Sequence, residues 1–84
     1  TINSIYPNPF NPTTTITILL SRSDKINISI YDLDGRLVQK LFQGFLKQGN
    51  HEFKLDASNF SSGPYVIVLS DSDKRIAQLI SLIK

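Results

Sequence analysis

The stretch that decides the fold is Ile26-Asn27-Ile28-Ser29-Ile30-Tyr31, in which apolar and polar side chains alternate. Side chains along an extended strand point alternately to its two faces, so this period places the three isoleucines on one face. A helix would instead repeat its apolar side chains about once per turn. The stretch therefore predicts a β-strand with one buried face and one solvent-facing side.

The same alternation recurs in two other places. Residues 15–18 alternate threonine with isoleucine, and residues 51–55 direct Phe53 and Leu55 to one face and charged side chains to the other. Each repeat predicts another strand with its apolar face turned inward. The side chains expected to form the core are Ile16, Ile18, Ile28, Ile30, Phe53, Ile67 and Leu69.

Two further segments are predicted to be strands on other grounds. Residues 65–69 form an apolar run without alternation, which is typical of a strand covered on both faces, and Pro64 can only open it because proline has no N–H. Residues 76–83 fit a helical stripe as well as a strand. The chain's eleven isoleucines and three valines favour the strand, because β-branched side chains lose rotamer freedom in a helix.

Short polar segments separate these strands. Asp34-Gly35 predicts a tight hairpin turn in which Gly35 has a positive φ, followed by a strand over residues 36–42. Residues 44–50 read as a loop, and residues 56–63 as a wide turn or one 3₁₀ turn. Six or seven strands joined by short turns predict an all-β fold, a small immunoglobulin-like antiparallel β-sandwich.

The chain is long enough for one domain. Its 84 residues, 40% of them apolar, support a single modest core. We expect residues 5–84 to form this domain and residues 1–4 to be a linker from an upstream domain, since the sequence begins with threonine instead of methionine. No window approaches the run of about 18 apolar residues that predicts a membrane-spanning helix.

Composition excludes several classes of function. The chain has no cysteine, which excludes disulfide frameworks, thiolate metal sites and thiol nucleophiles. Its formal charge is +2, and its nine Lys and Arg residues are scattered, apart from Lys74 and Arg75. Because nucleic-acid-binding surfaces need clustered basic side chains, we expect no nucleic acid partner.

Residues that could carry catalysis or bind a metal form no recognisable site. His51 is the single histidine, and no nucleophile motif accompanies it. The pairs Asp32 with Asp34 and Asp71 with Asp73 lie in predicted turns, where aspartate accepts backbone N–H bonds. The first pair resembles the start of a calcium loop, but the closing glutamate is missing. The sequence predicts no enzyme activity, no cofactor, no metal and no small-molecule substrate.

The most unusual stretch is Tyr6-Pro7-Asn8-Pro9-Phe10-Asn11-Pro12, which holds three of the chain's four prolines. Each proline fixes its own φ and biases the preceding residue away from helix, so the stretch predicts a stiff extended lead-in. We expect the prolines to guard a strand edge against further pairing. We also expect Tyr6 and Phe10 to close the end of the core.

Four ordered motifs resemble one known family. Residues 6–16, 30–38, 49–58 and 62–65 are together similar to the type A C-terminal sorting domain of the bacterial type IX secretion system, and the resemblance runs from residue 5 to residue 84. The family is similar to the immunoglobulin-like domain of flagellar hook-capping proteins. Two positions depart from its pattern: Gln78 stands where a basic residue is common, and Pro64 where a β-branched residue often precedes the tyrosine.

The resemblance implies a role in export. Family members are the C-terminal domains of larger secreted proteins and fold as seven-stranded sandwiches. It implies that the type IX translocon and its shuttle proteins recognise the domain, that the cargo reaches the outer membrane via the periplasm, and that a sortase-like surface peptidase then removes the domain. We expect a secreted or cell-surface protein whose sorting domain is a monomer.

The resemblance also implies which residues the translocon recognises. In the family the final strand is needed for export, and a terminal strand with free backbone N–H and C=O groups can pair with the edge of a receptor sheet. The residues that occupy this strand, with two from the motif before it, are Leu79, Ile80, Leu82, Ile83, Lys84, Gly63 and Tyr65.

Two other hypotheses belong to different functional classes. The first is a non-catalytic immunoglobulin-like accessory module that binds carbohydrate or acts as a spacer. Sugar-binding faces usually present coplanar aromatic rings, yet the chain has no tryptophan, and Tyr6, Tyr31 and Tyr65 lie in separate segments. The second is an assembly domain of the flagellar-hook type, which the length of the parent protein would separate from export cargo.

Overall fold

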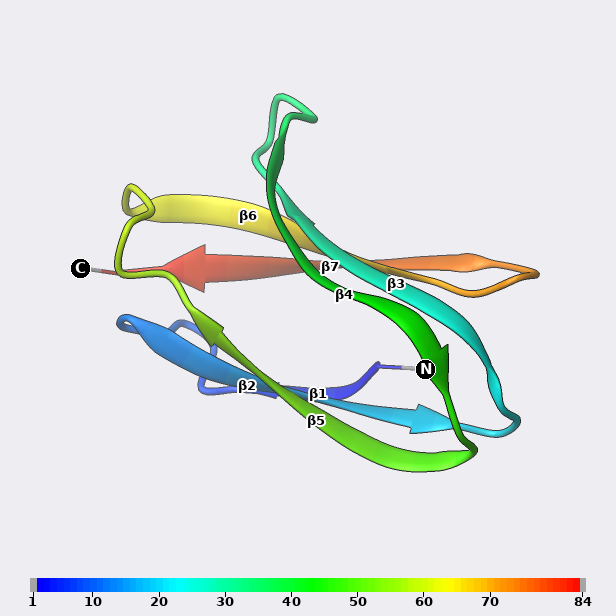
Figure 1. The fold of residues 1–84 in the computed structure, drawn as a ribbon. Helices are drawn as coiled ribbons and strands as arrows, with labels where there is room; N and C mark the ends of the chain where they lie inside the picture. Colours follow the sequence, from blue (N-terminus) through cyan, green and yellow to red (C-terminus); the bar gives the residue numbers. More distant parts are fainter. Residues whose placement is uncertain (1, 84) are drawn as a thin grey trace.

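The computed structural model describes residues 2–83, apart from the side chain of Asn3, and contains strands and turns without helix over this range (Figure 1). No segment of that range is therefore a helix long and apolar enough to cross a membrane. The seven strands of the described range are β1 (Ile2–Tyr6), β2 (Thr13–Leu20), β3 (Asp24–Tyr31), β4 (Leu37–Leu46), β5 (Gly49–Asp56), β6 (Gly63–Ser70) and β7 (Arg75–Leu82).

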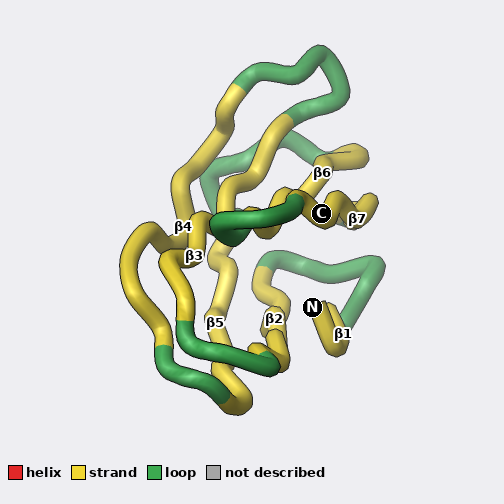
Figure 2. The backbone as a smooth tube through the Cα atoms, turned by 90° about the vertical axis from the view of Figure 1, so that its right-hand side faces the viewer, coloured by secondary structure: helices red, strands yellow, loops and turns green. Residues whose placement is uncertain are grey.

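The strands form two sheets that face each other (Figure 2). The smaller sheet has the order β1-β2-β5 and the larger sheet the order β4-β3-β6-β7, and all neighbouring strands within a sheet run antiparallel. The predicted all-β, immunoglobulin-like sandwich is confirmed. The C-terminal segment is a strand, as its isoleucine content predicted.

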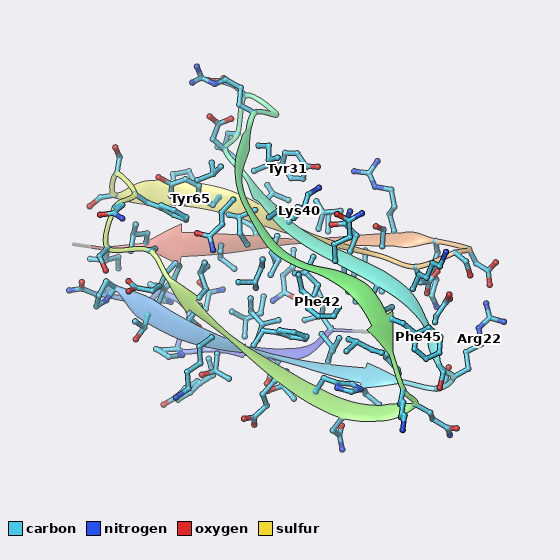
Figure 3. The ribbon with its side chains drawn as sticks, in the orientation of Figure 1. Arg22, Tyr31, Lys40, Phe42, Phe45 and Tyr65 are labelled. Atoms are coloured by element: carbon cyan, nitrogen blue, oxygen red, sulfur yellow. The ribbon has the colours of Figure 1, made fainter. Side chains whose placement is uncertain are left out.

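The core lies between the two sheets. Of the predicted core residues, all are buried except Phe53, which is half-buried and packs against the others. Its ring lies 5.1 Å from that of Phe42 on β4, measured between centroids, so this pair connects the two sheets near the turn from β4 to β5. Figure 3 shows the Phe42 side chain between the sheets.

Gly35 adopts the predicted positive φ, at 85°, in the turn between β3 and β4. The Asp32 carboxylate supports this turn by accepting bonds from the backbone N–H groups of Asp34 and Arg36. The bond from Arg36 is the main reason why the pKa of Asp32 lies below its ordinary value. Asp71 plays the same role before β7, so both aspartate pairs lie in turns as predicted.

The prediction of a loop over residues 44–50 is wrong. β4 continues to Leu46 with Gly44 opposite Ile26, and only residues 47–48 connect it to β5. Gly44 does not have a positive φ. A Cβ atom there would lie 3.3 Å from the Phe42 ring, so this glycine makes room for packing within a strand and does not end one.

Two further expectations need correction. β6 is not covered on both faces, because Val66 and Val68 are only half-buried on the outer face of the larger sheet. Tyr6 does not close the core, because the neighbouring Ile5 points inward and Tyr6, with 77% of its surface exposed, points to solvent. Residues 2–4 lie in β1, where Ile2 and Ser4 pair with β2, while the expected upstream domain stays a prediction.

Candidate functional site

The last strand lies at one edge of the larger sheet and pairs with β6 along its whole length without a register shift. In this register Tyr65 lies opposite Ile80, and Gly63 lies opposite Leu82. The structure therefore brings the start of β6 and the C-terminal segment together, although Gly63 and Leu82 are 19 positions apart in the sequence.

The predicted recognition residues of this strand divide by face. Ile80 and Leu82 are buried between the sheets, with 1% and 2% of their surfaces exposed. Leu79 and Ile83 point to solvent, with 59% and 55% exposed. Lys84 lies outside the described residues. Two of the predicted residues thus hold the strand in the fold, and the other two described ones are accessible to a partner.

The motif residues of β6 have structural roles at the same end of the sandwich. Tyr65 is nearly buried, its hydroxyl donates a 2.6 Å hydrogen bond to the carbonyl oxygen of Ser61, and its ring lies 5.4 Å from that of Phe60. Gly63 has a φ of 140°, which side-chain-bearing residues rarely adopt. Pro64 follows at a point where β3 has already ended, so its missing N–H leaves no gap in the sheet.

The proline-rich stretch covers the C-terminal part of the outer edge of β7. Residues 8–10, which we call the strap, follow β1 out of the smaller sheet and reach the last strand of the larger one, as the course of the β1–β2 loop beside β7 shows (Figure 2). The Phe10 N–H donates to the Ser81 carbonyl at 3.0 Å, and the Ile83 N–H donates to the Phe10 carbonyl at 2.9 Å. These bonds form a parallel bridge between Phe10 and Leu82.

Side chains reinforce the strap. The Asn8 amide group accepts a 3.0 Å bond from the Ser81 N–H and donates a longer one, at 3.4 Å, to the Leu79 carbonyl. The Phe10 ring is buried, with 2% of its surface exposed, as predicted. At the root of the strap, the buried Thr14 hydroxyl donates a 2.7 Å bond to the Pro7 carbonyl.

The strap corrects the expectation of a terminal strand whose backbone groups are free. The outward N–H and C=O of Ser81 and the N–H of Ile83 are bonded within the domain. The proline-rich stretch does guard a strand edge as predicted, but it does so by pairing with β7, some seventy residues away in the sequence. Sequence reasoning therefore missed Asn8 as a residue of this site, because nothing in the local pattern identifies its distant partner.

The edge of β7 is open before Leu79. The strap shows that odd-numbered residues of β7 direct their backbone groups away from β6. Backbone groups of alternate residues point the same way along a strand, so those of Arg75 and Ala77 also point outward. No hydrogen bond from another described residue reaches them. This open edge carries free donors and acceptors, which suit pairing with another polypeptide.

The opposite end of the sandwich is polar. Arg22 forms an ion pair with Asp73, and the Ser72 hydroxyl donates a 2.8 Å bond to the Asp24 carboxylate. That bond is the main cause that lowers the pKa of Asp24. The backbone N–H groups of Asp73 and Lys74 likewise lower the pKa of Asp71.

The structure places the remaining candidate residue away from any catalytic arrangement. His51 is half-buried on β5, and its Nε2 lies 2.7 Å from the Lys47 carbonyl oxygen. Within residues 2–83, no three His, Cys, Asp or Glu side chains are close enough together to hold a metal ion. What the site offers chemically is therefore strand pairing and an exposed apolar surface.

Comparison with known proteins agrees with this geometry. Residues 4–83 match the family described as secretion system C-terminal sorting domain. No curated protein sequence matches. Among solved structures, the chain is similar to PorZ, a surface component of the type IX secretion system of Porphyromonas gingivalis, with 26% sequence identity and a TM-score of 0.67. The similarity covers 96% of this chain and 11% of the PorZ chain. Because the family match spans nearly all of the sequence, the chain belongs to the family of secretion-system C-terminal sorting domains.

Proposed function

We propose that this domain is the export signal of a larger cargo protein and directs that cargo through the type IX outer-membrane translocon. The observation that carries the proposal is the family match over residues 4–83, which covers both the strap and the terminal strand. Membership of the family implies a secreted or surface-exported protein.

The finer steps belong to the same proposal. The cargo passes through the periplasm, translocon and shuttle proteins bind the folded or folding domain at its last strand, and a sortase-like surface peptidase removes it. Leu79, Ile80, Leu82, Ile83, Lys84, Gly63 and Tyr65 contribute to recognition, some directly and the buried ones by holding β7 in place. The domain itself acts as a monomer and catalyses no reaction.

A carbohydrate-binding role receives less support from the geometry. Tyr65 is nearly buried in the core, Tyr31 lies on the outer side of the larger sheet (Figure 3), and Tyr6 belongs to the smaller sheet. Stacking against a sugar chain needs aromatic rings on one accessible face, and these three rings do not share one.

The proposal is tested by fusing residues 1–84 to the C-terminus of a neutral reporter in a host with a type IX secretion system. The reporter should reach the surface or the medium, and export should be lost when residues 75–84 are deleted. Tyr6→Ser is a matched control, because it changes a solvent-facing side chain outside the strap and β7. Export that is unchanged by the deletion would contradict the proposal.

A further inference from the structure

We propose that the open edge of β7, residues 75–79, binds an extended strand of a partner protein, which then becomes the fifth strand of the larger sheet. The inference rests on the export function proposed above and specifies its contact surface. The partner is a polypeptide in extended conformation, recognised mainly through its backbone.

The open edge has the donors and acceptors that strand addition requires. The N–H and C=O groups of Arg75 and Ala77 and the N–H of Leu79 point away from β6 and have no partner among the described residues. An added strand would pair with these groups in the way that neighbouring strands of the sheet already pair with one another. Such pairing supplies affinity without a preformed pocket.

The chain itself demonstrates that this edge accepts a strand. The strap pairs with the same edge through Phe10 and ends where Asn8 contacts the Leu79 carbonyl. The open edge begins at that residue, so a partner strand would continue the row of bonds that the strap starts. A longer partner strand would have to displace Asn8 from Ser81 before it could pair further.

The other free edges are less suited to this pairing. β4 and β1 each pair with their neighbours through shifted registers, which bend an edge strand and oppose further pairing. β5 carries Glu52 and Lys54 in its exposed positions, and charged side chains also protect an edge. β7 has a regular register and no charged residue between Ile76 and Leu82.

Side chains next to the open edge indicate the chemistry of the partner strand. Leu37, Tyr31, Val66 and Leu79 lie opposite one another in register and form an apolar row across the outer face of the larger sheet, which ends at the exposed Leu79. A partner strand would extend this row with an apolar side chain. Beside the exposed Arg75, which has no ion-pair partner among the described residues, an acidic side chain fits.

The decisive variant is Ala77→Pro in the reporter fusion. Proline removes an N–H that points outward and places its ring in the path of an added strand, while the bonds from β7 to β6 use the residues on either side. We expect export to fall about tenfold or more, since loss of a single backbone bond together with a steric clash reaches that factor in affinity. Ala77→Val, which keeps the N–H, is the control at the same position and should be exported like the unchanged domain.

Two further variants separate loss of docking from loss of folding. Lys54→Pro places a proline in an exposed position of the β5 edge and should leave export unchanged. Arg75→Pro, compared with Arg75→Ala, repeats the test at the first residue of β7, where proline is best tolerated. Thermal unfolding of each purified domain shows whether the variant is folded.

The outcomes distinguish the two proposals. If folded Ala77→Pro or Arg75→Pro domains direct export as well as their controls do, the open edge is not the contact surface, although the export function stands. If the unchanged fusion is not exported in the type IX host, both proposals fail. Selective loss of export in the folded proline variants supports strand addition at this edge.

Discussion

The two ends of the sandwich are closed in different ways. At the end where the C-terminal residues lie (left in Figure 1), the strap inserts the Phe10 ring into the core and bonds through its backbone to β7. At the opposite end, the turns before β3 and before β7 are joined by exposed polar side chains, chiefly Arg22 with Asp73 and Ser72 with Asp24.

This difference indicates that the strap end contributes most of the stability, whereas the polar end mainly arranges exposed side chains. Burial of an aromatic ring contributes several times more free energy than an exposed ion pair, which is worth about 0–1 kcal/mol and weakens with salt. The stability of the domain should therefore depend on the strap end. β7 runs from the polar end toward the strap end, so the strap pairs with the last residues of β7. The region proposed for recognition, residues 75–79, lies nearer the polar end and is left open there.

Among the substitutions that test the two ends, Phe10→Ala should have the largest effect on the free energy of unfolding. The ring is buried between the sheets, and its removal leaves a cavity under β7. We expect the free energy of unfolding to fall by about 3–5 kcal/mol, a large part of the stability of a small domain. Urea unfolding measures the change.

The matched control is Tyr6→Ala, four residues earlier and exposed. Its cost should stay within about 0.5 kcal/mol, because it removes a side chain from solvent and not from the core. Equal losses for the two variants would contradict the view that the strap closes the core through Phe10.

Tyr65→Phe tests a buried hydrogen bond at the same end. The substitution keeps the ring against Phe60 but removes the hydroxyl that bonds to the Ser61 carbonyl. We expect a loss of about 1 kcal/mol in the free energy of unfolding, measured with urea. Tyr31→Phe, whose hydroxyl forms no hydrogen bond with another described residue, should be neutral, and an equal loss there would show that the bond to Ser61 is not the cause.

The contrast between the two ends also explains what the sequence could predict. Strands with a simple alternation, such as residues 26–31 and 51–55, and the turn at Gly35 follow from local rules of side-chain direction and positive φ. The C-terminal strand followed from β-branched composition. These features depend on neighbours in the chain.

The predictions from sequence were wrong where contacts between distant parts of the chain determine the structure. Gly44 stays within β4 because β4 pairs with β3 there, with Gly44 opposite Ile26, and the half-exposed outer face of β6 follows from the absence of a third layer in the described residues. The pairing of the strap with β7 depends on backbone bonds and one Asn8 side chain across some seventy residues. No local periodicity encodes such a contact, so the covered part of the candidate site could be found only in the structure.

Asn8→Ala should have a smaller effect than either aromatic substitution. It removes two exposed hydrogen bonds to β7 but leaves the Phe10 ring and its backbone bonds in place. We expect a loss of about 0.5–1 kcal/mol and faster hydrogen exchange at the Ser81 amide. Asn11→Ala, an exposed control in the same loop, should change neither quantity, and slow exchange at Ser81 in Asn8→Ala would show that Asn8 does not hold the strap.

Arg22→Ala tests the polar end and should lower the free energy of unfolding by less than Asn8→Ala does. The ion pair with Asp73 is exposed on both sides, so its removal should change the free energy of unfolding by about 0.5 kcal/mol or less, and the difference should shrink in high salt. A loss as large as that of Phe10→Ala would overturn the assignment of stability to the strap end.

The pH dependence of stability should come from the carboxylates of the turns and not from the buried Phe10 ring. Hydrogen bonds lower the pKa of Asp24, chiefly from the Ser72 hydroxyl, and the pKa of Asp71, chiefly from the Asp73 N–H. A carboxylate whose pKa is lower in the folded state stabilises the fold at pH values above its unfolded-state pKa of about 3.9. This contribution is lost as the pH falls through the folded-state pKa.

Thermal unfolding between neutral and acidic pH should therefore show a falling midpoint as the carboxylates protonate. The double variant Asp24→Asn and Asp71→Asn should make this fall shallower, while Asp32 and Asp56, whose pKa values are also lowered, preserve part of it. Phe10→Ala should lower the midpoint at every pH by a similar amount, because the Phe10 ring carries no charge and is buried in the apolar core. A steeper acid dependence in Phe10→Ala than in the unchanged domain would mean that the two ends are coupled and not separately closed.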